Sequence, residues 1–253
     1  MRVLLALLIG AVFLLFTACV PVRTTATTSN GQSNERFDEG MVTITFDDGF
    51  KNGYEVALPL LRSAKIRANF FVITNTFHKN DARYMTESDM LRLVSADQET
   101  GSHSQSHPHL TRLSDDKIKE EVLGSKKDLM ARRIPSCTFA YPYDDYNDNV
   151  VRVVKSSRYI GARTCAPGFN FRDSDRFLLK DQTVIVTTTP KEIRAWVDKA
   201  IAERTWLILV FHSIDRTGLP YSATPETLQA TIECLRARNV KTVTMAEGIK
   251  KMR

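Results

Sequence analysis

The sequence predicts an α/β fold, either a (β/α) barrel or a doubly wound sheet, and three observations support this prediction. Short apolar runs recur from residue 41 onward, and some of them, such as 206–211, are apolar throughout, as expected of parallel strands buried on both faces. Helical stretches with recognisable starts lie between these runs. Titratable residues directly follow several runs, at the strand ends where such folds place their active sites.

Each apolar run is a candidate strand because it is short, rich in β-branched and aromatic residues, and bounded by polar residues. A further short strand is expected just before the histidine-rich segment 101–110. The other predicted strands span residues 41–46, 68–74, 137–141, 159–164, 183–188, 206–211 and 240–245.

The helix starts are marked by hydroxyl side chains that can accept a hydrogen bond from the first turn of a helix. Two of them have an acidic residue three positions later, which is the spacing of a capping box, and one of these also has proline at the first helical position. The predicted starts are Ser114, Thr224 and the two boxes Thr86 to Asp89 and Thr189 to Glu192.

The composition indicates a globular domain with no nucleic-acid partner. The chain has 253 residues, of which 43% are hydrophobic and 25% are charged. Its formal net charge is +6, but the basic residues are scattered and form no run, which argues against a nucleic-acid interface. We expect one domain that functions as a monomer.

The first residues are typical of an export signal. Residues 1–18 contain Arg2 and then an apolar stretch that is too short for a comfortable membrane span. Cys19 follows small residues, as in a bacterial lipoprotein signal, so we expect lipid on its sulfur and a membrane anchor in the cell envelope. Phe16 stands where such signals usually have leucine, which leaves ordinary signal-peptide cleavage as the alternative.

Residues 19–40 are polar and rich in threonine and serine, so they are predicted to be a flexible tether before a single domain at 41–253. Export implies an oxidising compartment. The domain has three cysteines, Cys137, Cys165 and Cys234. Either Cys137 and Cys165 form a disulfide or all three are free thiols.

Two histidines are candidate metal ligands because of their spacing. His103 and His107 are four residues apart, so one helical turn would bring both imidazoles to the same face. His109 follows a proline that ends any helix, and His78 has no partner at a matching distance, so both are interpreted as surface or supporting residues. A third ligand must then come from elsewhere.

The adjacent carboxylates Asp47 and Asp48 are the obvious source of that ligand. They follow the predicted strand 41–46, and neighbouring side chains at a strand end point in different directions. One can therefore bind a metal ion while the other stays free as a base. A divalent ion held by one carboxylate and two neutral imidazoles keeps open coordination positions. An ion of this kind is suited to hydrolysis.

Four segments together resemble the ordered motifs of the polysaccharide deacetylases, carbohydrate esterase family 4, which share the NodB homology domain. They are TFDDG (45–49), HSQSHPHLTRLS (103–114), FAYPYDDYN (139–147) and LVFHSI (209–214). The resemblance implies a single deformed (β/α) barrel of about seven parallel strands. It also implies removal of N-acetyl groups from an N-acetylhexosamine polysaccharide, with release of acetate.

The resemblance assigns a role to each residue of the motifs. Asp48, His103 and His107 would hold one divalent metal ion, with zinc expected and cobalt, nickel or iron also suited to these donors. The catalytic residues would be Asp47, Tyr143 and His212. Asp47 would be the general base that activates water, the backbone N–H of Tyr143 would stabilise the oxyanion, and His212 would be the general acid that protonates the leaving amine.

Residues for substrate binding are also implied. Val210 matches the aliphatic position that lines the pocket for the acetyl methyl group, and Tyr141 and Tyr221 lie in segments expected to flank the metal. Arg163 is counted with them as a candidate substrate-binding residue.

The chain departs from the family pattern at three places. Ala140 stands where many relatives have an arginine that orients the base; Arg163 on a neighbouring predicted strand could supply the charge, or it could be a structural residue. Asp144 replaces the usual glycine, and aspartate tolerates a left-handed backbone better than most residues. Segment 167–182 lacks the tryptophan that often closes the acetyl pocket.

The motif FAYPY resembles a subset that acts on poly-N-acetylglucosamine, although peptidoglycan and chitin-like glycans are equally compatible with the residues. Two other functions stay open. An O-acetyl esterase would use the same centre, and a glycan-binding lipoprotein without catalysis could keep the scaffold. Asp47 and His212 argue against the last alternative, because binding a metal or a sugar requires neither.

Overall fold

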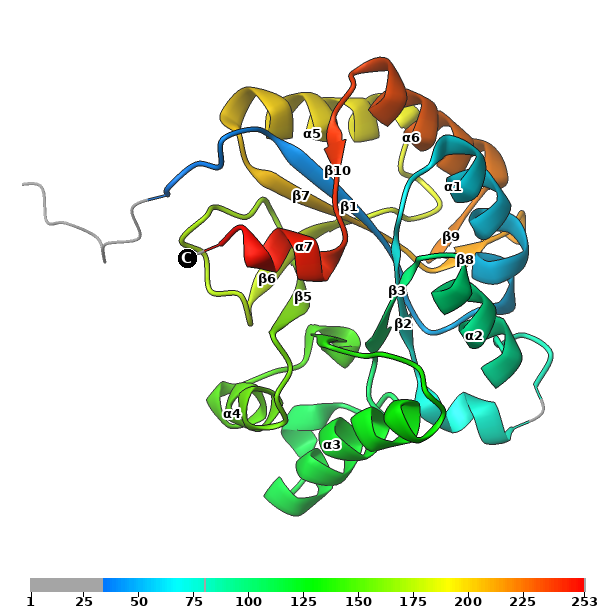
Figure 1. Ribbon diagram of the computed structural model, residues 1–253, viewed down its shortest axis with the longest axis vertical. Helices are drawn as coiled ribbons and strands as arrows, with labels where there is room; N and C mark the ends of the chain where they lie inside the picture. Colours follow the sequence, from blue (N-terminus) through cyan, green and yellow to red (C-terminus); the bar gives the residue numbers. More distant parts are fainter. Residues whose placement is uncertain (1–33, 80, 253) are drawn as a thin grey trace, which may run out of the picture. The chain divides into compact units, whose positions relative to one another are not determined.

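The computed structural model describes residues 34–79 and 81–252, and these form a closed barrel of seven parallel strands surrounded by helices (Figure 1). Each strand pairs with the next in the sequence, and the last pairs with the first, so that no edge is left between them. This confirms the predicted (β/α) barrel. The strands are β1 (Met41–Phe46), β2 (Asn69–Val72), β3 (Glu99–Ser102), β4 (Thr138–Ala140), β5 (Gly161–Pro167), β6 (Leu179–Thr183) and β7 (Trp206–Phe211).

The barrel is deformed where β1 meets β2. β1 pairs with β7 along its whole length, but only its last two residues, Thr45 and Phe46, pair with β2. The first two, Met41 and Val42, pair instead with β10 (Lys241–Thr242), which fills the gap that the diverging strands leave. A small separate pair, β8 (Ser213–Ile214) with β9 (Ser222–Ala223), shapes the loop after β7.

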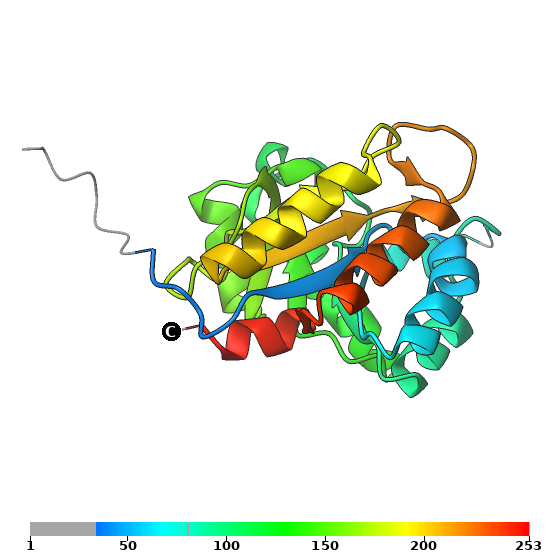
Figure 2. The same ribbon diagram turned by 90° about the horizontal axis from the view of Figure 1, so that it is seen from above.

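Helices cover the outside of the barrel, and the predicted caps begin most of them (Figures 1 and 2). Thr86 and Thr189 form complete capping boxes with Asp89 and Glu192, and Thr224 accepts a hydrogen bond from the first turn of its helix. The helices are α1 (Leu58–Ala64), preceded by a π-helical turn (Gly53–Ala57), α2 (Glu87–Ser95), α3 (Asp115–Ala131), α4 (Asp148–Ser156), α5 (Pro190–Glu203), α6 (Pro225–Ala237) and α7 (Met245–Lys250).

The side chains of the strands alternate between two apolar layers. One layer lies between barrel and helices, and it includes Ile44, Leu209 and Phe211. The other fills the base of the barrel, where Trp206 is fully buried and its indole N–H donates to the Thr43 hydroxyl at 2.8 Å. Burying a large apolar side chain contributes about 1.5–3 kcal/mol. The rigid base holds the strands whose other ends carry the titratable residues.

Two strand predictions were wrong in position. Of the run 183–188 only Thr183 belongs to a strand, because β6 lies earlier at Leu179–Thr183. There the polar residues Lys180 and Gln182 alternate with the buried residues Leu179 and Asp181. The run 240–245 keeps only two strand residues before Thr244 caps α7. In both cases an apolar run was interpreted as a strand, whereas the extent of a strand is decided by its pairing with neighbouring strands.

The packed structure begins before the predicted boundary at residue 41. Phe37 is buried, and its backbone N–H donates to the Arg204 carbonyl at 2.9 Å. The predicted signal segment 1–18 and Cys19 lie outside the described residues. Within the described part of the chain, no helix has the length and apolar character needed to cross a bilayer. Cys137, Cys165 and Cys234 are free thiols, so the disulfide alternative is not realised here.

Candidate metal centre and catalytic site

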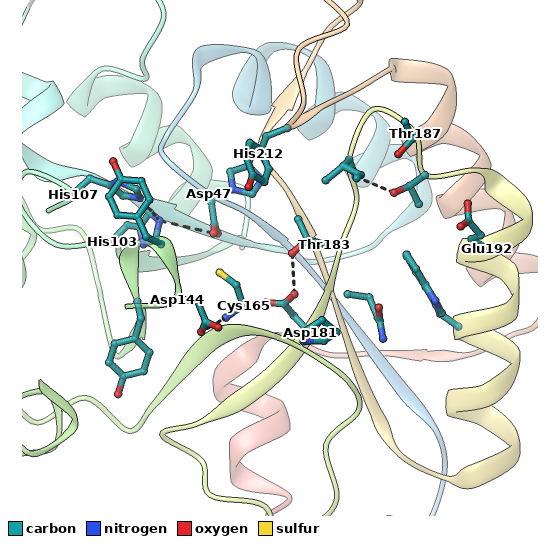
Figure 3. Close-up of a pocket in the computed structure, with 18 residues that line it drawn as sticks. Asp47, His103, His107, Asp144, Cys165, Asp181, Thr183, Thr187, Glu192 and His212 are labelled. Carbon is teal, nitrogen blue, oxygen red and sulfur yellow. Dashed lines mark hydrogen bonds and ion pairs between the residues drawn. The ribbon is translucent and has the colours of Figure 1, made fainter. Parts of the chain in front are cut away.

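The two histidines are brought together by a loop, and not by the helical turn that their spacing predicted. His103 directly follows β3, and the chain then turns sharply through Ser104 and His107, which have left-handed φ angles of 64° and 60°. The Ser104 hydroxyl accepts the His107 backbone N–H at 2.9 Å and closes the turn. The two Nε2 atoms consequently lie 3.1 Å apart (Figure 3).

The orientation of His103 is fixed by β4. Its Nδ1 lies 2.8 Å from the Ala140 carbonyl, so Nδ1 carries the proton and donates it, which leaves the Nε2 lone pair free to ligate. Burial lowers the pKa of His103 to about 3, so the imidazole is neutral at any physiological pH. A neutral, oriented imidazole is the form that binds a divalent metal.

Asp48 completes a set of three donors. It has a left-handed φ of 69°, and its Oδ1 lies 3.6 Å from Nε2 of His103 and 3.5 Å from Nε2 of His107. Ligands held about 2.0–2.2 Å from one tetrahedral ion are about 3.3–3.6 Å apart. The two distances from Asp48 fall in this range, and the 3.1 Å between the two imidazole nitrogens is slightly shorter, so the three atoms are close to the arrangement that a zinc-sized ion needs. Burial and the neighbouring Asp47 raise the pKa of Asp48 to about 7, and a bound cation would offset both effects.

Asp47 is a second buried carboxylate beside this set, and it is held by an ion pair. Its Oδ2 accepts a hydrogen bond from Arg163 and lies 3.9 Å from Nε2 of His103, whereas its Oδ1 is buried with no hydrogen-bond partner among the described residues. Burial alone would raise the pKa of Asp47, but Arg163, together with His103 and His212, outweighs it and lowers the pKa below its usual range. An ionised carboxylate therefore has a free oxygen at the edge of the candidate metal centre.

Arg163 lies inside the barrel, where it bridges two carboxylates. Its guanidinium is fully buried, pairs with Asp47, and donates to Asp181 on β6 at 3.0 Å. Burial raises the pKa of Asp181 to about 6, although Arg163 opposes this shift. The predicted contact of Arg163 with substrate is therefore not what the structure shows, because the side chain is inaccessible. The other prediction, that Arg163 supplies the charge missing at Ala140, agrees with its position.

His212 and Tyr221 lie on the opposite side of the cavity mouth from the other histidines. His212 follows β7 directly, and its ring centre lies 5.1 Å from that of Tyr221, which is 61% exposed. Burial lowers the pKa of His212, and its Nδ1 has no hydrogen-bond partner among the described residues. Val210, two residues before His212, is fully buried in the apolar base below the cavity. Its side chain therefore does not line the cavity.

Tyr143 sits in a strained turn next to the histidines. Tyr143 and Asp144 both have left-handed φ angles, of 57° and 56°, which confirms the conformation expected where the family has glycine. The Asp144 carboxylate accepts the Cys165 backbone N–H at 2.8 Å and ties this turn to β5. The Tyr143 ring packs edge-on against His107 at 4.3 Å and stacks on His109 at 4.4 Å, so His109 supports the site without joining the metal set.

One cavity of about 690 Å³ connects these groups (Figure 3). Asp47, His103, His107 and His212 line one end of it, together with Tyr141, Tyr143 and Tyr221. Sequence reasoning missed the opposite wall, which β6, the loop after it and α5 form. Alternation of Leu179, Asp181 and Thr183 was the available signal for β6, but their apolar content is too low to mark a strand by hydropathy. The missed lining residues include Asp181, Gln182, Thr183, Thr187, Thr188, Glu192 and Trp196.

Comparison with known proteins agrees with the motifs and defines the class of protein. The family described as "Polysaccharide deacetylase" matches residues 34–161, which is half of the chain, so the chain belongs to the polysaccharide deacetylase family. The resemblance found in the sequence is thereby confirmed, whereas the poly-N-acetylglucosamine subset is not specifically supported.

Particular relatives agree with this assignment. The chain is similar to "Putative polysaccharide deacetylase YxkH" of Bacillus subtilis (strain 168), with 29% identity over 56% of this chain and 50% of that protein. It is also similar to a "Peptidoglycan-N-acetylglucosamine deacetylase" of Bacillus cereus, with 29% identity over 48% of this chain and 55% of that protein. The matches thus span about half the length of these curated relatives.

A solved structure supports the fold. The Xyl-CE4 domain of a multidomain xylanase, from the hindgut metagenome of Trinervitermes trinervoides, superposes with a TM-score of 0.61. The sequences are 22% identical, and the match covers 85% of this chain and 91% of that one. At this identity the likeness shows the barrel and not the activity.

Proposed function

We propose that the protein is a metal-dependent deacetylase that removes N-acetyl groups from N-acetylhexosamine residues of a polysaccharide. The observation that carries the proposal is the convergence of Asp48, His103 and His107 beside a further carboxylate, Asp47, that is outside the set. Family membership supports the reaction class. Poly-N-acetylglucosamine, peptidoglycan and chitin-like glycans all carry the required amide.

Asp48, His103 and His107 would hold the ion, most readily Zn²⁺, and the donors also suit Co²⁺, Ni²⁺ or Fe²⁺. When bound, such an ion polarises a carbonyl oxygen and lowers the pKa of water. The donor set fits because both imidazoles are shifted toward the neutral form and the carboxylate atom lies within 3.6 Å of each.

The protein's own residues divide the remaining work. Asp47 accepts a proton from the attacking water at its unpartnered Oδ1, and Arg163 keeps that carboxylate ionised and oriented. The backbone N–H of Tyr143 donates to the developing oxyanion. His212, across the cavity, donates a proton to the departing amine nitrogen as the carbon–nitrogen bond breaks, which yields acetate and a free amino sugar.

The test is acetate release from a panel of substrates by metal-stripped and zinc-restored protein. We expect release from chitooligosaccharides, poly-N-acetylglucosamine or peptidoglycan that depends on the added ion. Release from acetylxylan alone would identify an O-acetyl esterase. Glycan binding with no acetate release, unchanged in Asp47→Asn, would identify a binding protein on this scaffold. Either result overturns the proposal.

We also propose that the protein is exported and anchored in the cell envelope through lipid on Cys19. The support is the signal-like sequence of residues 1–18 and the small residues before Cys19. Mass spectrometry of the mature N-terminus tests this. We expect a diacylglyceryl-modified Cys19 in the membrane fraction and a soluble protein after Cys19→Ser. An unmodified, cleaved N-terminus would show an ordinary signal peptide.

A further inference from the structure

The cavity continues well beyond the candidate metal centre, and this second part has no role in the proposed reaction. From the histidine end it passes the ends of β5 and β6, where Cys165 and Thr183 lie, and it reaches the start of α5 (Figure 3). We call the second part the distal arm and define it by Gln182, Thr188, Glu192 and Trp196, which all line it.

The distal arm lies on the side of the barrel where one helix of the regular pattern is missing. β5 and β6 are joined by residues 168–178 without a helix, unlike the connections from β1 to β5 and from β6 to β7 (Figure 1). Asp181 points into the barrel toward Arg163, so its neighbour Gln182 faces outward. Outward side chains of β6 therefore face the open space beside α5, where Trp196 is only partly buried.

The groups in the distal arm are those that hold a sugar ring. The Trp196 indole offers a flat apolar face, and such faces pack well against the C–H groups of a pyranose. Gln182 offers an amide beside it. Glu192 uses Oε2 to cap α5 through Thr189, while its Oε1 has no partner among the described residues. One carboxylate oxygen is thus available to a ligand without loss of the cap.

The charge of the cavity restricts which sugar fits. Four carboxylates line the cavity, those of Asp47, Asp144, Asp181 and Glu192, and none of its described lining residues is lysine or arginine, although the chain has a net charge of +6. Arg163 contacts two of these carboxylates, but it is fully buried and already paired with Asp47 and Asp181. Asp47 and Asp181 are thus compensated, whereas Glu192 has no ion-pair partner among the described residues. A uronic acid or another anionic sugar in the distal arm would therefore be repelled by the Glu192 carboxylate.

We propose that the distal arm is a subsite for a sugar of the glycan chain that lies beyond the two units of a disaccharide, with Trp196 as its stacking face, and that it takes a neutral or amine-bearing hexosamine. This rests on the proposed function, because the chain must reach the catalytic end at the same time. Deacetylation converts a neutral acetamide into an ammonium group, so Glu192 pairs with a sugar that the enzyme has already processed. Partly deacetylated chains are accordingly good substrates and anionic glycans are poor ones.

The first test compares short and long substrates. Acetate release is measured with the disaccharide and the hexasaccharide of N-acetylglucosamine for wild type, Trp196→Ala and Trp196→Phe. We expect Trp196→Ala to raise KM for the hexasaccharide about tenfold, with kcat and the disaccharide kinetics unchanged, and Trp196→Phe to restore most of the loss. Equal effects on both substrates, or none, would overturn the subsite.

Tyr54→Ala is the matched control, because Tyr54 is a partly buried aromatic residue on the π-helical turn outside this cavity. It should alter neither substrate. Thermal unfolding of each variant separates loss of packing from loss of binding, since Trp196 also contacts the core beneath α5. Unchanged disaccharide turnover in Trp196→Ala shows in addition that the catalytic end is intact.

The second test addresses charge. We expect wild type to prefer a hexasaccharide with one free amine over the fully acetylated one, and Glu192→Gln to lose this preference while it keeps the α5 capping box. Glu226→Gln is the control, since Glu226 lies in the first turn of α6 and does not line the cavity. A preference that survives in Glu192→Gln overturns the assignment of that carboxylate.

Direct binding separates failure of the subsite from failure of the proposed function. The chain has two tryptophans, and Trp206 is fully buried, so a ligand in the distal arm changes the emission of Trp196. Titration of Asp47→Asn with the hexasaccharide should shift this emission even if no acetate is ever released. No shift with the hexasaccharide, at concentrations that saturate turnover in wild type, would overturn the subsite while leaving catalysis in place.

Discussion

The two sides of the barrel mouth carry their functional residues in different ways. On the side of β1, β3 and β7, three candidate site residues directly follow a strand, namely Asp47, His103 and His212. On the side of β5 and β6, Arg163 and Asp181 lie within the strands and point into the barrel. The first side presents groups to a ligand, and the second holds one of those groups in place from below. Reactive and supporting residues can thus be separated by their position along a strand.

The largest effect is expected on the first side. Asp48→Ala or His103→Ala removes one of three donors, and the resulting loss of several kcal/mol of electrostatic stabilisation should lower acetate release at least ~10⁴-fold. Metal analysis of the purified variants should show less than stoichiometric zinc. A variant that retains both zinc and activity would rule out this ligand set.

Asp47→Asn separates proton transfer from metal binding. The amide keeps the size of the side chain but cannot accept the proton, so kcat should fall about 10³-fold while zinc stays bound. Because the amide also weakens the pairing with Arg163, unfolding in urea should be measured alongside. Loss of zinc together with activity would place Asp47 among the ligands instead.

Arg163→Met tests the supporting side. The change leaves Asp47 and Asp181 as uncompensated buried carboxylates, which should cost about 3–5 kcal/mol in the free energy of unfolding and lower kcat about 10²-fold. Arg163→Lys should recover part of both losses. The stability is read from urea unfolding at pH 7. An active, stable Arg163→Met protein would show that the bridge does not position the base.

Metal affinity should depend on pH through Asp48. The pKa of this carboxyl is raised to about 7 without metal, so below pH 7 it must lose a proton before it can ligate. The apparent affinity for zinc should fall about tenfold for each unit of pH between pH 7 and pH 5, with one proton released per ion. His103 adds nothing in this window, because its pKa is about 3. Calorimetry in buffers of different ionisation enthalpy measures the proton count, and a release of two or more protons contradicts the assignment.

The smallest effect is expected at the turn that joins the two sides. Asp144→Gly relieves a left-handed φ of 56° but loses the hydrogen bond to the Cys165 backbone, and these changes offset each other to within about 1 kcal/mol. Asp144→Val should be clearly worse, because a β-branched residue avoids this conformation. Thermal unfolding of the pair checks the prediction, which fails if both variants behave alike.

The same comparison explains what could be predicted from the sequence. Helix caps and apolar strands such as 206–211 are local signals, so the barrel and most helix starts followed from them. The donors at strand ends were found because they stand in short motifs. For Arg163 the sequence left two roles open, and Asp181 was missed. The ion pair between them depends on the register of β5 and β6 and not on the spacing of the two residues in the sequence. The turn that joins His103 to His107 was predicted as a helix, since spacing alone does not distinguish a helical turn from a left-handed loop.

The pairing of Met41 with both Trp206 and Lys241 has a consequence for how the chain folds. The first strand finds two of its three neighbours only after nearly the whole polypeptide is available, so ring closure has a high contact order and should be a late, slow event. Until then β1 exposes an unsatisfied apolar edge, a surface on which chaperones can act and from which aggregates can grow. Dilution out of denaturant should accordingly give better yields at low protein concentration than at high.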